Sequence, residues 1–108
     1  MTDQTDKLVG LITASSEEEA RKIAKSLVEE RLAACVSIIP SVRSIYRWKE
    51  EIHDDEEFLL VVKTSGKQFE AIKTLVHELH SYETPEIIAL PIVSGSGKYL
   101  EWMNKNLG

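Results

Sequence analysis

The sequence predicts an α+β fold, in which two strand–helix–strand halves share one antiparallel sheet. Two stretches with apolar residues at helical spacing alternate with four runs of strand-like composition. The chain has 108 residues, which is enough for one domain and too few for two. No internal repeat or linker interrupts the pattern, so residues 1–108 are expected to form a single domain.

The first half contains a strand followed by a helix. Residues 1–6 are polar and acidic and are expected to be a mobile tail, whereas residues 7–14 are apolar enough for a strand inside a sheet. Ser15 and Ser16 are each followed three residues later by a glutamate, which is a capping-box signature that predicts a helix start at either serine. The apolar face of this helix would consist of Ala20, Ile23, Ala24, Leu27 and Val28.

The middle of the chain predicts a hairpin of two unusually long strands. Residues 35–48 and 52–64 have strand composition, with a reversal between them and an expected bend, bulge or edge position at Pro40. Strands usually have about 5–6 residues, so the far end of this hairpin should project from the body. Tyr46 and Trp48 at that end predict an intersubunit surface, because aromatic residues are enriched in such contacts. Alternatively, they cover the core of their own subunit.

The second half begins with a helix that starts at Ser65 or Gly66. Pro85 excludes a helical conformation at the residue before it, so this helix must end earlier. The apolar run 87–90 then predicts a buried strand that ends near residues 92–93, and residues 98–106 predict a short third helix. The apolar stripe of the second helix would consist of Phe69, Ile72, Leu75, Val76 and Leu79.

This order of elements is the ferredoxin-like βαββαβ arrangement, with an extended hairpin between the second and third strands and an additional C-terminal helix. The net charge of −5 and the lack of a basic stripe argue against nucleic acid as a partner. No apolar segment approaches the roughly 20 residues of a membrane span, so no membrane association is expected. The single cysteine, Cys35, fits a reducing compartment, and the start of the chain has no signal-peptide pattern. We therefore expect a cytoplasmic protein.

Histidines and acids around the end of the second helix are the candidate metal ligands. His77 and His80 are three residues apart, and Glu83 and Glu86 follow. Imidazole and carboxylate groups suit copper, zinc or nickel. The alternatives are a site with both histidines, a site at His80 completed by another subunit, or no metal site at all. No nucleophile–base pair can be assembled from the sequence, so no catalytic residue is predicted.

Six segments recur in the order and spacing of one known family. They are residues 30–36 (ERLAACV), 39–40 (IP), 44–48 (SIYRW), 62–64 (VKT) and 82–87 (YETPEI), and Tyr99 with Leu100 and Trp102. Together they resemble the CutA divalent-cation tolerance family, over about residues 9–102.

The resemblance implies a ferredoxin-like subunit in a tight homotrimer, similar in architecture to the PII signalling proteins, with the long hairpins packed between subunits. It implies a cytosolic, non-enzymatic role in the tolerance of copper and other divalent cations, with no required cofactor. Metal would bind in intersubunit clefts near His80, Tyr82 and Glu83, so we predict His80 and Glu83 as metal ligands. The alternatives are a PII-like module that senses small molecules or takes part in signalling, and a structural scaffold without a ligand.

Three positions differ from the pattern of the family. Some bacterial members are assigned copper ligands from a first-strand cysteine and two adjacent histidines. In this chain the first strand ends without a cysteine, and Leu79 precedes His80, so only His80 carries over. Glu50 occupies the hairpin turn, where the family usually has glycine.

Overall fold

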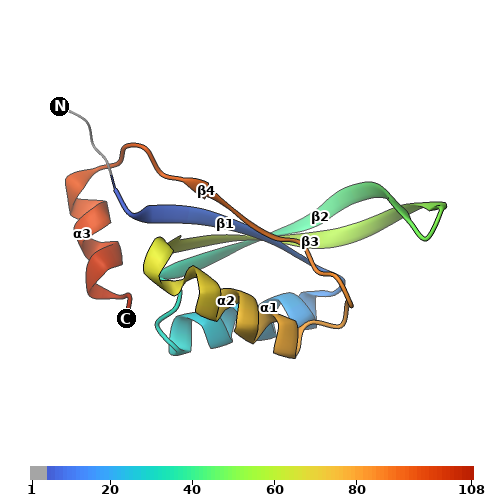
Figure 1. Ribbon diagram of the computed structural model, residues 1–108, viewed down its shortest axis with the longest axis horizontal. Helices are drawn as coiled ribbons and strands as arrows, with labels where there is room; N and C mark the ends of the chain where they lie inside the picture. Colours follow the sequence, from blue (N-terminus) through green and yellow to red (C-terminus); the bar gives the residue numbers. More distant parts are fainter. Residues whose placement is uncertain (1–4) are drawn as a thin grey trace.

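A computed structural model describes residues 5–108 of the chain (Figure 1). Residues 1–4, which form most of the predicted tail, lie outside the described part. The last two residues of that tail are hydrogen bonded to the body. The Thr5 hydroxyl donates to the carbonyl of Ile92 at 2.7 Å, and the amide of Gly66 donates to the carbonyl of Asp6 at 2.8 Å.

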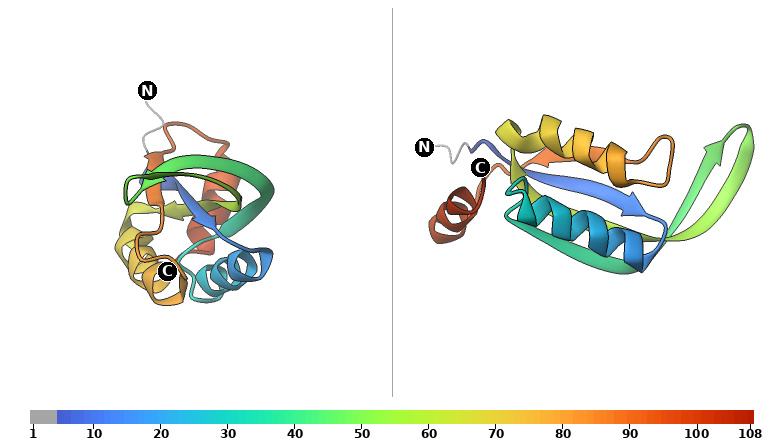
Figure 2. Two further views of the ribbon diagram at one scale, coloured as in Figure 1. Left: turned by 90° about the vertical axis from the view of Figure 1, so that its right-hand side faces the viewer. Right: turned by 90° about the horizontal axis from the view of Figure 1, so that it is seen from below.

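The described chain follows the predicted order of strands and helices. The elements are β1 (Lys7–Ala14), α1 (Glu17–Glu29), β2 (Cys35–Trp48), β3 (Glu51–Ser65), α2 (Gly66–Leu79), β4 (Ile87–Pro91) and α3 (Gly97–Lys105). The strands form one antiparallel sheet in the order β2-β3-β1-β4. Figures 1 and 2 show α1 and α2 side by side on one face of this sheet and α3 at the end opposite the hairpin. This arrangement confirms the ferredoxin-like prediction.

Ser16, rather than Ser15, is the N-cap of α1. Its side chain accepts a hydrogen bond from the amide of Glu19 at 3.1 Å, while the Glu19 carboxylate accepts one from the amide of Ser15 at 3.0 Å. The reciprocal bonds satisfy amides that have no partner within the helix. They also direct the Glu19 side chain toward the end of β1.

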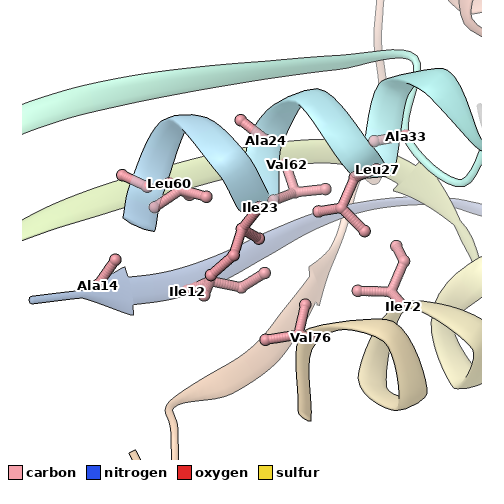
Figure 3. Packing of buried hydrophobic residues seen from close by; sticks show 11 residues of the cluster. Ile12, Ala14, Ile23, Ala24, Leu27, Ala33, Leu60, Val62, Ile72 and Val76 are labelled. Atoms are coloured by element: carbon pink, nitrogen blue, oxygen red, sulfur yellow. The ribbon is translucent and has the colours of Figure 1, made fainter. Parts of the chain in front are cut away.

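The core lies between the two helices and the sheet (Figure 3). The helical stripes predicted from the sequence supply one side of it, except for Val28, which is 42% exposed. Alternate residues of β1 and β3 supply the other side. Its largest fully buried apolar side chains in this layer are Ile12, Ile23, Leu27, Leu60, Val62, Ile72 and Val76.

The β2–β3 hairpin projects beyond the body, as predicted, and gives the subunit a long axis of 47 Å against 29 and 22 Å (Figure 1). Its register shifts between Ile39 and Val42, and Ser41 has a φ of 61°. The irregularity adjoins Pro40, where a bend was expected. Tyr46 and Trp48 are 38% and 39% exposed, so they do not belong to the core of their own subunit.

The prediction of a buried fourth strand is wrong for the single chain. Among the strands of residues 5–108, β4 pairs only with β1, and Ile88 and Leu90 are 51% and 55% exposed. These side chains lie on the sheet face opposite the helices, because the alternate residues of the same strands face the core. We call this surface the open sheet face. Its apolar residues are Val9, Leu11, Ile39, Leu59, Val61, Ile88 and Leu90.

Candidate functional site

His80 lies at the C-cap of α2, and both of its ring nitrogens are engaged. Its Nε2 is 2.7 Å from the carbonyl oxygen of Thr13, and its Nδ1 is 3.0 Å from the amide of Tyr82. A carbonyl oxygen only accepts hydrogen bonds, so Nε2 carries the proton and Nδ1 accepts from Tyr82. The ring is buried and holds the segment 80–86 against the end of β1.

Glu19 supports the same segment from the start of α1. Its carboxylate accepts a hydrogen bond from the amide of Ser81 at 2.7 Å and lies 3.9 Å from Nδ1 of His80. Burial by itself would raise the pKa of Glu19, but the hydrogen bonds from Ser15 and Ser81 outweigh it and hold the pKa below its usual range. The interactions of His80 and Glu19 therefore join α1, β1 and the segment 80–86.

The other candidate ligands are exposed, whereas the His80 ring is buried. Glu83 is exposed on the segment 80–86, and His77 is exposed on α2. His80 is the C-cap of α2, with φ −82° and ψ 142°, so the chain leaves the helix after it. Its ring is buried against Thr13, whereas His77 is exposed, so the structure does not present the two rings as a pair. Within residues 5–108, no group of three or more His, Cys, Asp or Glu side chains is arranged to hold a metal ion.

A group of phenols and carboxylates along the hairpin was not predicted. The Tyr82 hydroxyl donates to Glu57 at 2.8 Å, and the Tyr46 hydroxyl donates to Asp55 at 2.5 Å. Glu57 is 4% exposed although it carries a carboxylate. These residues come from β2, β3 and the segment 80–86, so sequence spacing contains no signal for the group.

Burial and hydrogen bonds to acids raise the pKa values in this group. The hydrogen bond to Asp55 raises the pKa of Tyr46 to about 12. Burial and then the hydrogen bond to Glu57 raise the pKa of Tyr82. Burial raises the pKa of Glu86, and the nearby Glu57 carboxylate adds to the effect. Both phenols therefore remain protonated donors at neutral pH.

Cys35 lies on the open sheet face beside a lysine. The Nζ of Lys63 donates to the Ser37 hydroxyl at 2.8 Å and is 3.9 Å from the sulfur of Cys35. The thiol is partly buried, in agreement with its small, apolar character.

The sheet order, the helical layer and the projecting hairpin define a ferredoxin-like α+β domain with an uncovered apolar sheet face. The chain belongs to the CutA1 divalent ion tolerance protein family, whose model matches residues 8–106. The family predicted from the six segments is thereby confirmed.

Similar proteins share this family name and fold. The divalent-cation tolerance protein CutA of Thermus thermophilus is 56% identical over 100 residues, which cover 93% of this chain and 97% of that relative. A solved structure of the T. thermophilus protein is 55% identical, with a TM-score of 0.92 over 94% of this chain and 99% of that one.

A second solved structure, titled the periplasmic divalent cation tolerance protein CutA of Archaeoglobus fulgidus, is 41% identical. Its TM-score is 0.90 over 93% of this chain and 97% of that one. The chain spans about half the length of several plant and animal relatives that it matches.

Proposed function

We propose that this chain acts in the tolerance of divalent cations, with copper as the first candidate, and that it does so without catalysing a reaction. The observation that carries the proposal is its membership of the CutA1 family, together with the name of its 56% identical T. thermophilus relative.

We also propose that the functional unit is a homotrimer with cation sites between its subunits. Monomeric proteins rarely expose large contiguous apolar patches. Here the open sheet face and the hairpin both expose large apolar side chains. A trimer that buries these surfaces would explain their composition. The exposed residues that support it are Ile39, Ile45, Trp48, Ile52, Ile88 and Leu90.

The cation site that we propose contains Glu83 and His80 in different roles. Glu83 is exposed, so its carboxylate is free to approach a cation held between subunits. His80 would have to break its bond to Thr13 or to Tyr82 before a ring nitrogen could bind metal. Losing a buried hydrogen bond costs about 1–3 kcal/mol. We therefore infer that Glu83 contacts the cation and that His80 positions the segment on which Glu83 lies.

Copper titration by calorimetry tests this proposal. We expect Glu83→Gln to weaken copper binding with little change in the free energy of unfolding. His80→Ala should lower that free energy by about 1–3 kcal/mol, because it leaves the Thr13 carbonyl and the Tyr82 amide without their partner. His77→Ala, an exposed histidine on the same helix, is the control and should change neither quantity.

The outcomes separate the roles of the two residues. Uptake of copper by the unaltered protein no greater than nonspecific binding would contradict the site. If His80→Ala abolished binding while the unfolding free energy stayed the same, His80 would be a direct ligand instead.

We propose the cytoplasm as the location of the protein. In the part of the chain that the structure describes, no helix is both long and apolar enough to cross a membrane. The single cysteine favours a reducing compartment. Because the A. fulgidus relative is titled periplasmic, cell fractionation is needed to decide, and recovery with periplasmic markers would overturn this proposal.

A further inference from the structure

The four-stranded sheet gives way to the two-stranded hairpin at Glu57. β1 pairs with β3 as far as Phe58, which lies opposite Ala14, so Glu57 is the first residue of β3 beyond the end of β1. Glu57 pairs with Val42, the first β2 residue after the register shift. Within residues 5–108, β3 therefore pairs only with β2 from Glu57 to the turn, and Figure 1 shows this part leaving the body.

Tyr82 reaches this junction from the segment 80–86. Its hydroxyl donates a hydrogen bond to Glu57 at 2.8 Å, and its amide donates to Nδ1 of His80 at 3.0 Å. The rings of Tyr82 and His80 are also in contact, with centroids 4.8 Å apart. Because His80 is hydrogen bonded to Thr13 in β1, one end of Tyr82 is fixed to the body and the other end to the hairpin.

Glu57 depends on this phenol because it is a buried acid. It is 4% exposed, and none of the ion pairs among residues 5–108 includes it. A carboxylate that has lost its water needs hydrogen-bond donors in exchange. Burial and then the bond to Glu57 raise the pKa of Tyr82, so the hydroxyl keeps its proton at neutral pH and supplies such a donor.

A contact at this junction affects the direction of the whole hairpin. Two-stranded ribbons twist more strongly than wide sheets and are marginally stable by themselves. The irregularity of β2 beside Glu57, where Ser41 has a φ of 61°, bends the ribbon at the same level. Because the hairpin extends along the 47 Å axis of the molecule, a small change at its start displaces its far end (Figure 1).

We propose that the Tyr82–Glu57 hydrogen bond couples the segment 80–86 to the hairpin, so that a cation at Glu83 and one orientation of the hairpin stabilise each other. The cation in this inference rests on the proposed function, in which Glu83 contacts it. Glu83 follows Tyr82 directly in the chain, so a cation that fixes Glu83 also holds the phenol on Glu57. Conversely, the bond orders the segment before the cation arrives, which reduces the entropy lost on binding. The coupling is equal in both directions, and Tyr82 and Glu57 act as positioning residues.

The first test needs no metal and uses the complete chain in its native assembly. Hydrogen exchange of residues 51–57, measured by mass spectrometry, reports opening of the hairpin at its start. Glu19→Ala removes the acceptor of the Ser81 amide and loosens the segment, so exchange should become about fivefold faster. Tyr82→Phe keeps the ring but removes the hydroxyl, so exchange should already be faster, and adding Glu19→Ala should change it no further. Glu18→Ala, an exposed neighbour, is the control.

The second test adds Cu²⁺. Copper should slow exchange at residues 51–57 in the unaltered protein but not in Tyr82→Phe, whose copper affinity, measured by calorimetry, should fall about fivefold. Glu57→Gln keeps a carbonyl oxygen that can accept from the phenol, so it should retain the coupling that Glu57→Ala loses. Tyr46→Phe is the matched control, because it removes a phenol–carboxylate bond to Asp55 that lies wholly within the hairpin. It should leave the copper affinity unchanged.

The outcomes separate this coupling from the cation site. The coupling is overturned if Glu19→Ala leaves exchange at residues 51–57 unchanged, or if it speeds exchange equally with and without the Tyr82 hydroxyl. It is also overturned if copper binds to Tyr82→Phe as tightly as to the unaltered protein. If the metal-free coupling is observed but the unaltered protein takes up no copper, the cation site fails and the connection between the segment and the hairpin is supported.

Discussion

The tip of the β2–β3 hairpin consists of two residues with left-handed backbone conformations. Trp48 pairs with Glu51, and between them Lys49 and Glu50 have φ values of 51° and 67°. A two-residue turn of this kind matches the twist of the strands but requires positive φ at both positions. For residues other than glycine, this conformation costs roughly 1–2 kcal/mol each.

Glu50→Gly should therefore stabilise the protein. Glycine removes the strain but adds about 0.5–1 kcal/mol of unfolded-state entropy, so we expect a net gain of about 0.5 kcal/mol in the free energy of unfolding. Chemical denaturation at fixed protein concentration would measure it. Glu51→Gly, one residue further into β3, is the control and should destabilise instead. A loss of stability for Glu50→Gly would show that the Glu50 side chain makes a compensating contact.

Glu19 connects elements that are distant in the sequence. It belongs to the capping box of α1, binds the amide of Ser81 and lies close to His80. The start of α1 is therefore tied to the segment between α2 and β4. Because that segment carries Glu83, the capping residue of one helix helps to position the proposed cation site.

The lowered pKa of Glu19 predicts a pH dependence for this connection. A depressed folded-state pKa contributes stability above the unfolded value, near 4.5, and the contribution is lost as pH falls through the folded pKa. We expect the stability difference between the unaltered protein and Glu19→Gln to be constant near neutral pH and to shrink below about 4.5. Urea denaturation across pH would measure it. Glu18→Gln, an exposed neighbour, is the control, and an equal pH dependence for both variants would refute the role of Glu19.

Whether β4 is buried depends on its place in the sheet and on neighbouring chains, not on its own sequence. Its apolar run is typical of a strand that is covered on both faces, yet within the subunit it lies at the edge with Ile88 and Leu90 exposed. The apolar composition of β4 is explained if a neighbouring copy of the chain covers the open sheet face. The same explanation applies to the exposed apolar residues of the hairpin.

For the whole molecule, we expect light scattering to give a mass close to three times the 12.2 kDa of one chain. Ile88→Asp combined with Leu90→Asp should reduce this mass, because two carboxylates would have to lose their hydration inside the interface. Thr74→Asp, on the exposed side of α2, is the control and should leave the mass unchanged. A mass near 12.2 kDa for the unaltered protein at all concentrations would contradict the trimer.

The sequence by itself determined the elements, their order and the family. The helical stripe of Phe69, Ile72 and Val76 has spacings of three and then four residues, which share one face of a helix but not of a strand. Pro85 ends a helix through local sterics. These signals come from residues close together in the chain, so they can be interpreted without knowledge of the fold. The six ordered segments between residue 30 and Trp102 likewise identified the family from the sequence alone.

Only the tertiary structure decided what the candidate residues contact. The sequence allowed His80 to be a metal ligand, but folding brings Thr13 and Tyr82 to its two ring nitrogens. Glu57 and Tyr82 meet although 25 positions separate them. Such contacts depend on which strands pair and on which face a side chain lies, and local sequence does not encode either one. The edge position of β4 is the same kind of result, because burial belongs to the assembly of elements and not to the strand itself.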